Sequence, residues 1–562
     1  MCGVVGITDR DETYIDQALK SIQHRGPDGA GKYINNSVSL GHCLLAITSA
    51  PKEGNQPYTT PRNNILVYNG EIFNYDDLVQ QETNFKPKTT CDTELLAWGL
   101  DTYGIDFIKK IDSMHAFVYY DVNKQKLYLS RDHVGIKPLY YAKCKQGLVF
   151  ASEIRAIKHK VSTHHEIDAV ALSSWSHLGC NFTRNTFYKG ISRLMPGECW
   201  QYDIPTKQMN LVHRIIPETK NTRRFDAEEF RLQVKDTCRK TIRGLRKIGI
   251  FLSGGLDSTM ITHEIAQMMP NVSTYSSCVE PLPQDKEDFN ADFRCGKLLA
   301  QRLNIPHHKI VCTPDTWQQY LRDSVSHLEE PFYNGSLPMY CQMNHQMASD
   351  GVVVTIAGDM GDEVLAGYSK YRHIGLHNPT WRQLVDKWMN RLSQPPRVPC
   401  ELNRNQLLDL LIKDVFPDSM YNPLDVINSF MLLDVTANCS ADFFQRNDRF
   451  GMAYGMEGRF PLATKQFIDY AMSIPSTDKI QGSNMKRMSK IAYQDILPNE
   501  IIHKPKTGWT APHQQWVNQS ETDQHTLRKH QPNTVIPYRG RKIESVMHQY
   551  YVWCDVNRMH TC

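Results

Sequence analysis

Short apolar or alternating runs, each bounded by Asn, Asp or Gly, dominate the chain up to about residue 200. They cover residues 2–8, 65–68, 116–122, 126–130 and 148–151, and such runs predict β-strands. Two stretches of helical periodicity interrupt them, one over residues 12–23 and one that starts near Asp92. Strands that follow one another with only a few helices predict packed antiparallel sheets covered by helices.

In the second half of the chain the spacing of apolar residues is different. Residues 248–252 and 352–357 are apolar throughout, and a further strand is expected at 272–275. Helical patterns over residues 228–246 and 258–269 alternate with these runs. Continuous apolar strands that alternate with helices predict a buried parallel sheet, and therefore an α/β domain.

The length of 562 residues is too great for one hydrophobic core, since domains usually have about 100–200 residues. We predict a first domain over residues 2–202 and a second over 228–516. The polar stretch 203–227 between them is expected to be a linker. Residues 517–562 form a polar C-terminal extension to which the sequence assigns no role.

Composition excludes several classes of protein. The formal net charge of +4 is too small for this length to predict binding to nucleic acid or to an anionic membrane. The 15 cysteines include no C-x-x-C pair, which predicts a reduced, cytoplasmic protein. No signal peptide and no apolar run of about 18 residues occurs, so no membrane partner is expected.

Cys2 is the first candidate for chemistry. Removal of Met1 would place its thiol beside a free α-amine, whose unperturbed pKa of about 7.7–8.0 suits a local base. A cysteine near the start of a chain is by itself weak evidence of catalysis. Six further segments accompany it: His24-Arg-Gly-Pro-Asp-Gly29, Asn69-Gly-Glu-Ile-Phe-Asn-Tyr75, Cys91-Asp-Thr-Glu94, Arg131-Asp132, Gly135-Ile-Lys-Pro-Leu-Tyr140 and Phe150-Ala-Ser-Glu-Ile154.

In this order and spacing, these segments resemble the glutaminase domain of the N-terminal-nucleophile amidotransferases. The resemblance implies that Cys2 attacks the side-chain amide of glutamine. It makes the Asn69 side chain and the Gly70 N–H the oxyanion hole, where losing one donor typically costs about 10²–10³ in rate. Glu71 and Asp92 would lie near the glutamine α-ammonium, although Asp92 could instead cap the helix that it begins.

The glutamine-binding segment departs from the family at one position. The family pattern is Gly-His-x-Arg-Leu-x-Ile, and its Arg holds the glutamine α-carboxylate. Here residues 41–47 read Gly-His-Cys-Leu-Leu-Ala-Ile, so Leu44 occupies the Arg position while Ile47 is kept. Three explanations stay open: another cation compensates, glutamine binds weakly, or free ammonia is the nitrogen source. Because Cys2 and Asn69 are intact, we expect weak but real glutaminase activity.

A second candidate site lies between the apolar strand 248–252 and the next helix, where the chain reads Ser253-Gly-Gly-Leu-Asp-Ser258. Glycines let a backbone approach a ligand, and loop N–H groups before a helix favour an anion. A carboxylate beside phosphates is accommodated by Mg²⁺, which makes Asp257 a metal ligand. The alternative is an ordinary glycine-rich turn.

The motif resembles the pyrophosphate loop of ATP pyrophosphatases. The residues implied for ATP and pyrophosphate are Leu252, Ser253, Gly254, Gly255, Asp257, Ser258, Ser277, Ala357, Gly358 and Lys486. In the acidic loop 358–363 the resemblance makes Asp362 the second Mg²⁺ ligand and Asp359 the acid near the acceptor. Met360 stands where Gly is usual. Lys506 is implied to neutralise phosphate charge during adenylation.

Across residues 2–516, including a motif at 446–461, the chain is similar to the glutamine-hydrolysing asparagine synthetases. That family implies an N-terminal αββα antiparallel sandwich of the Ntn-hydrolase type and a C-terminal doubly wound parallel α/β domain. It implies ATP, Mg²⁺, aspartate, and glutamine or ammonia as reactants and cofactors, with AMP and pyrophosphate released. A sibling amidotransferase for another carboxylate, a non-catalytic relative, and a homodimer stay open.

Overall fold

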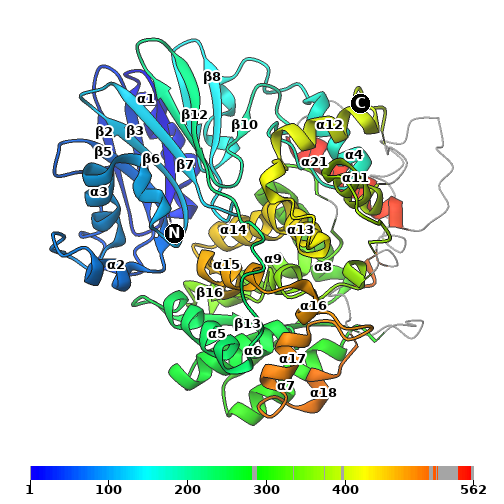
Figure 1. Cartoon of the computed structure of the whole chain (residues 1–562). Coiled ribbons are helices and arrows are strands. Elements are labelled where there is room, and N and C mark those ends of the chain that lie inside the picture. Colours follow the sequence, from blue (N-terminus) through cyan, green and yellow to red (C-terminus); the bar gives the residue numbers. More distant parts are fainter. Residues whose placement is uncertain are drawn as a thin grey trace.

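The computed structural model describes residues 2–280, 288–332, 334–372, 374–393, 398–505, 511–513, 516 and 542–557. The N-terminal half, in blue to cyan, lies beside the C-terminal half, in green to orange (Figure 1). Among the described residues, no helix combines the length and the apolar character needed to cross a membrane.

The N-terminal half contains two six-stranded antiparallel sheets. The first has the order β10-β8-β9-β1-β3-β2, and its strands are β1 (Gly3–Ile7), β2 (Gly29–Ile34), β3 (Ser39–Leu44), β8 (Tyr140–Cys144), β9 (Gly147–Ala151) and β10 (Ser192–Arg193). The second has the order β12-β11-β7-β6-β5-β4, and its strands are β4 (Tyr58–Thr59), β5 (Ile65–Ile72), β6 (Ser113–Asp121), β7 (Lys126–Arg131), β11 (Glu198–Asp203) and β12 (Gln208–Arg214).

The two sheets pack face to face. Val4, Leu40 and Phe150 of the first sheet share one buried cluster with Val67 and Val118 of the second. Separate clusters join the other faces to helices, so that the first sheet packs on α1 and α4 and the second packs on α2 and α3. The helix bounds are α1 (Glu12–Ser21), α2 (Tyr75–Gln81), α3 (Asp92–Tyr103) and α4 (Ala169–Leu178). The predicted αββα sandwich is confirmed.

The C-terminal half is built on a five-stranded parallel sheet with the order β15-β14-β13-β16-β17. Its strands are β13 (Ile248–Phe251), β14 (Ser273–Val279), β15 (His307–Cys312), β16 (Val354–Ile356) and β17 (Glu457–Arg459). The chain builds outward from β13 in one direction and then returns to build in the other, which confirms the doubly wound prediction. In such sheets ligands bind at the carboxyl ends of the strands where the direction reverses, here between β13 and β16.

Helices connect and flank this sheet. They are α5 (Ala227–Thr241), α6 (Leu256–Met268), α7 (Ala291–Leu303), α8 (Pro314–Leu328), α9 (Leu337–Ser349), α10 (Gly361–Val364), α11 (Trp381–Leu392), α12 (Arg404–Asp414), α13 (Val426–Leu433), a π-helical segment (Asp434–Phe443), α14 (Phe444–Ala453), α15 (Lys465–Ser473), α16 (Ser476–Lys479), α17 (Arg487–Tyr493) and α18 (Asn499–Ile502).

Two segments between the halves differ from expectation. β12 lies inside the stretch 203–227 predicted to be a linker, because it pairs along its length with β11. Within that stretch, helix and strand are absent from the turn 204–207 before β12 and from residues 215–226 after it. The helix expected over residues 228–246 ends at Thr241, since Gly244 takes a φ of +141°. The chain then turns along the glutaminase half before β13 begins.

The C-terminal extension contributes the helix α21 (Lys542–Asn557). The Trp553 indole donates to the main-chain oxygen of Glu329 (2.8 Å), which directly follows α8. Tyr550 stacks on Trp175 of α4, with ring centroids 5.0 Å apart. The extension, which the sequence left without a role, therefore ties the two halves together.

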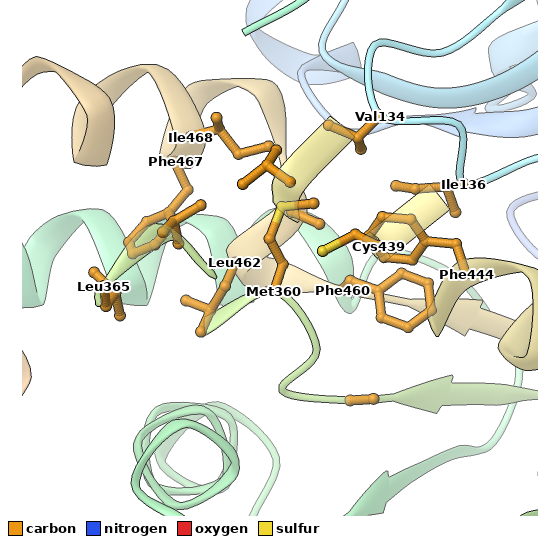
Figure 2. Packing of buried hydrophobic residues seen from close by; sticks show 14 of the residues in the cluster. Val134, Ile136, Met360, Leu365, Cys439, Phe444, Phe460, Leu462, Phe467 and Ile468 are labelled. Carbon is orange, nitrogen blue, oxygen red and sulfur yellow. The ribbon is translucent and has the colours of Figure 1, made fainter. Parts of the chain in front are cut away.

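A buried apolar layer also joins the halves. Val134 and Ile136, from the loop after β7, belong to the same cluster as Met360, Phe444 and Phe460. Figure 2 shows Met360 near the centre of this layer, with Ile136 beside Cys439 and Phe444 on one side of the view and Phe467 and Leu365 on the other. This layer holds the two candidate sites in one body.

Candidate functional site

The structure brings the predicted glutaminase residues together around the start of β1. The Cys2 main-chain nitrogen donates to Oδ1 of Asn69, a β5 residue 67 positions away, over 3.0 Å. Cys2 and Asn69 are both buried. Burial raises the pKa of the Cys2 thiol above its usual value, so little thiolate forms at neutral pH without a base.

The Asn69 amide is oriented as an oxyanion donor requires. Its Nδ2 is buried and has no hydrogen-bond partner among the described residues, although such donors are normally paired. At Gly70 a methyl group would lie 2.2 Å from the Met114 carbonyl oxygen and 2.6 Å from the Tyr68 ring. Only glycine therefore fits at this position.

Asp92 begins α3 but does not cap it. Its Oδ2 accepts hydrogen bonds from the Tyr68 hydroxyl (2.9 Å) and the Ile72 N–H (3.0 Å). Burial raises the pKa of the Asp92 carboxyl, and the positive charge of Arg243 opposes that rise. Asp92 is thus held at the β5 edge beside Cys2, where a cationic ligand group could meet it.

A narrow cavity of about 30 Å³ connects these residues. Of the predicted residues it is lined by Cys2, Leu44, Ile47, Gly70, Glu71 and Asp92. Such a volume accommodates water molecules. Glu457 of the synthetase half also lines it, which the sequence did not predict.

The second site lies where the parallel sheet reverses direction. The loop after β13 enters α6, whose N-cap Gly255 provides no side-chain cap, and the N-terminus of a helix favours an anion. Gly254 has a φ of +77°, and a methyl group there would lie 2.1 Å from the Asp292 carbonyl oxygen. The hydroxyls of Ser253 and Ser258 are 2.9 Å apart. The loop geometry fits the expected phosphate cradle.

Asp257 and Asp362 face each other across this loop. Lys486 Nζ lies 2.5 Å from a carboxylate oxygen of each, so one cation already bridges the pair. No cluster of three or more His, Cys, Asp or Glu side chains suited to a metal occurs within the described ranges. Proteins often hold Mg²⁺ by one or two carboxylates together with substrate phosphates, and this pair fits that pattern.

Asp359 lines the same cavity. Asn447 Nδ2 donates to Asp359 Oδ2 over 3.4 Å, and Arg446 Nη2 lies 3.8 Å from Oδ1. Burial raises the pKa of Asp359, and the Arg446 charge partly reverses that shift. The cavity wall therefore offers a carboxylate and a guanidinium side by side, a pair that suits an amino-acid zwitterion.

The enclosed cavity has a volume of about 490 Å³, large enough for a nucleotide. All the predicted nucleotide, acceptor and metal residues that the structure describes line it: Leu252, Ser253, Gly254, Gly255, Asp257, Ser258, Ser277, Ala357, Gly358, Asp359, Asp362 and Lys486. Lys506 lies outside the described residues. Sequence reasoning missed Tyr340, Phe443, Tyr368 and Lys504, which also line the cavity, and gave no role to Arg446 although its motif was noted.

Met360 adopts a left-handed backbone conformation, with a φ of +76° and a ψ of −12°. Glycine takes that conformation without steric cost, whereas other residues are strained by about 1–2 kcal/mol. The Met360 side chain is almost completely buried in the layer between the halves. Its packing offsets the strain, and the loop keeps the shape that a glycine would give it.

Comparison with known proteins gives two family matches. Residues 1–212 match a glutamine amidotransferase domain, and residues 229–543 match the asparagine synthase family. "Asparagine synthetase [glutamine-hydrolyzing] 1" of Bacillus subtilis is 24% identical and covers 92% of this chain and 88% of its own length. "Asparagine synthetase [glutamine-hydrolyzing] 2" of the same organism is 28% identical over 90% of this chain and 71% of its own. A "putative asparagine synthetase [glutamine-hydrolyzing] 2" of Methanocaldococcus jannaschii is 27% identical over 75% and 86%.

Proposed function

The chain belongs to the asparagine synthase family, and from that premise we propose that it is an ATP-dependent amidotransferase that converts aspartate to asparagine. Its relatives in Bacillus subtilis are named as glutamine-hydrolyzing asparagine synthetases. At 24–28% identity the acceptor of this chain is a separate question, and aspartate is the acceptor that we propose.

One observation carries the proposal. Asp257 and Asp362 converge at the reversal point of the parallel sheet, on the same cavity that holds Asp359 and Arg446. A phosphate cradle beside a carboxylate–guanidinium pair supports a reaction between ATP and an amino acid. The Cys2 and Asn69 site in the other half supplies the nitrogen.

The residues then take the following roles in activation. The loop 253–258 and the start of α6 hold the phosphates of ATP, while Lys486 neutralises charge on the pyrophosphate leaving group. Asp257 and Asp362 would hold Mg²⁺, which supplies charge neutralisation at the phosphates. The aspartate β-carboxylate attacks the α-phosphorus, so that β-aspartyl-AMP forms and pyrophosphate leaves.

Nitrogen is released at the first site. The Cys2 thiol gives its proton to the α-amine that the loss of Met1 exposes, and the sulfur attacks the glutamine amide. The amine returns that proton to the leaving nitrogen, so that ammonia departs and a γ-glutamyl thioester forms, and water then hydrolyses the thioester to glutamate and frees the thiol. Asn69 Nδ2 and the Gly70 N–H stabilise the oxyanion of the tetrahedral intermediate. Ammonia passes to the second site, where Asp359 accepts a proton as it displaces AMP. The tight layer between the halves keeps water from the passing ammonia.

A sibling reaction with another carboxylate is the second candidate, because an identity of 24–28% to the relatives leaves the acceptor open. ATP–pyrophosphate exchange measured with a panel of carboxylic acids separates the two. Aspartate-dependent exchange that disappears in Asp362→Asn is the expected result. Exchange supported by a different acid, and not by aspartate, would identify a sibling enzyme.

A further inference from the structure

Leu44 leaves the glutamine pocket without the cation that its relatives place there. The side chain is buried and lies against Gly54 in the pocket wall. The walls instead carry the carboxyl groups of Glu71, Asp92 and Glu457. An α-carboxylate that entered this pocket would meet negative charge unless a cation from elsewhere reached it.

Three arginines from the synthetase half lie near this pocket: Arg459, Arg243 and Arg246. Arg459 is fully buried and its donors are already used, by Glu71 (3.1 Å), Glu457 (2.6 Å) and the Thr241 carbonyl oxygen (2.9 Å). Arg459 therefore neutralises the carboxylates of the pocket wall. Its existing hydrogen bonds prevent its guanidinium from turning toward a ligand.

Arg246 lies on the outer side of the pocket wall. Its Nη1 is 3.4 Å from both Asp28 Oδ2 and the Ala46 carbonyl oxygen, and its side chain is 36% exposed. These contacts are long, and Arg246 does not line the cavity among the described residues. It makes a suitable control for a nearby positive charge.

Arg243, like Arg246, does not line the cavity among the described residues, but it pairs closely with the wall residue Glu71. Its Nη1 is 3.0 Å from Glu71 Oε1, its Nη2 donates to the Thr90 carbonyl oxygen (2.7 Å), and its guanidinium covers the Tyr75 ring at 4.1 Å. The Thr90 hydroxyl in turn donates to the main-chain oxygen of Thr48 (2.8 Å), which lines the pocket. The Arg243 guanidinium therefore lies outside the cavity, connected through Thr90 to Thr48, which directly follows the predicted glutamine-binding segment 41–47.

The backbone around Arg243 is built to hold this position. Leu245 N–H donates to the Ile47 carbonyl oxygen over 2.8 Å. A methyl group on Gly244 would lie 2.8 Å from Ile47 Cγ2, so a glycine is needed for the loop to approach so closely. The loop between α5 and β13 is therefore fixed against the segment that carries Leu44.

Glu71 can release Arg243 at low cost, because Arg459 also pairs with it. A guanidinium that turns from Glu71 to a ligand carboxylate exchanges one charged hydrogen bond for another.

We propose that Arg243, a residue of the synthetase half, binds the α-carboxylate of glutamine and replaces the arginine that Leu44 lacks. The inference rests on the proposed glutaminase function and adds to it a residue that determines donor specificity. It also means that the glutamine pocket is completed only where the two halves meet.

The test compares Arg243→Met with Arg246→Met on two amide donors: glutamine, and glutamine α-carboxamide, which lacks the charged carboxylate. Ammonia release is measured for each donor, and ammonium-dependent AMP formation is measured in parallel to establish that each variant is folded.

In the unaltered protein glutamine is preferred. In Arg243→Met the KM for glutamine rises about 10- to 100-fold, the range for one charged hydrogen-bonding group, while kcat and the KM for the α-carboxamide change little.

Adding Leu44→Arg to Arg243→Met restores the KM for glutamine, and Arg246→Met behaves like the unaltered protein. An unchanged KM and an unchanged donor preference in Arg243→Met would overturn the assignment of Arg243 while leaving the glutaminase intact. Loss of preference in Arg246→Met alone would overturn it as well. An unaltered protein that forms AMP with ammonium but never hydrolyses glutamine would contradict the glutaminase function itself, and Arg243 with it.

Discussion

Arg25 of the glutaminase half and Asp448 of the synthetase half form a bidentate ion pair, with Nη1–Oδ2 at 2.8 Å and Nη2–Oδ1 at 3.1 Å. The Arg25 side chain is fully buried, and the Asp448 side chain is only 2% exposed. Arg25 Nε also donates to the main-chain oxygen of Cys2 over 3.2 Å. One guanidinium therefore contacts both the nucleophile and the partner domain.

Asp448→Asn should damage the glutaminase although Asp448 belongs to the other half. Removing one partner of a buried ion pair typically costs about 3–5 kcal/mol, and here it also loosens the group that holds the Cys2 backbone. We expect a lower free energy of unfolding in urea and slower glutamine hydrolysis. Asp386→Asn, which breaks the partly exposed pair with Arg404, should cost less than about 1 kcal/mol. Equal effects of the two substitutions would contradict this account.

Lys486→Met should abolish most ATP–pyrophosphate exchange. The substitution removes the ammonium that lies 2.5 Å from both Asp257 and Asp362, so the carboxylates repel each other and the leaving group loses a cation. A loss of about 10²–10³ in kcat is expected for one preorganised group. Lys490→Met is the matched control, since Lys490 lines the same cavity but donates to Asn484. Exchange that survives in Lys486→Met would remove that lysine from the mechanism.

Met360→Gly should destabilise the protein even though it relieves backbone strain. Relief contributes about 1–2 kcal/mol, whereas emptying a buried methionine site costs about 2–5 kcal/mol. Packing therefore prevails, and the free energy of unfolding should fall by about 1–3 kcal/mol. Asn63→Gly is the control, because Asn63 has a φ of +61° but is exposed and packs against no core. A Met360→Gly protein more stable than its parent would refute the packing argument.

Lys479→Met should stabilise the protein by an amount that depends on pH, because the substitution removes a buried amine. Lys479 Nζ donates to Asn428 Oδ1 over 2.9 Å. Burial lowers the pKa of Lys479 to about 7, and the charge of Asp425 opposes that shift. Between pH 7 and the ordinary lysine pKa, the unfolded chain holds a proton that the folded protein does not, so stability rises with pH. The melting temperature of Lys479→Met should exceed that of the parent most at pH 6–7, and the difference should shrink toward pH 9. A constant difference would contradict the shifted pKa.

Much of the fold and of both sites follows from local sequence. The strand pattern at 65–68 and the apolar run at 248–252 were sufficient to predict which elements end at the sites. Asp257 was identified from its glycine-rich motif after a buried strand, and Asp362 from the family resemblance. The two meet because each follows a strand of the parallel sheet, and the carboxyl ends of parallel strands lie at one edge.

Contacts between distant segments were not predictable in the same way. Arg243 reaches Glu71 across 172 positions, and Glu457 enters a pocket formed by the other half. No local pattern encodes such docking, because it depends on how the two halves pack. β12 was missed for a related reason: its residues are largely exposed on an edge strand, so its polar sequence was taken for a linker.

The most direct test of two sites that work in series is product analysis with ATP and aspartate, using either glutamine or ammonium as the nitrogen donor. AMP, pyrophosphate and asparagine should form in equal amounts with both donors, and Cys2→Ala should abolish synthesis with glutamine alone. Formation of ADP and phosphate, or AMP formation that does not require aspartate, would contradict the account.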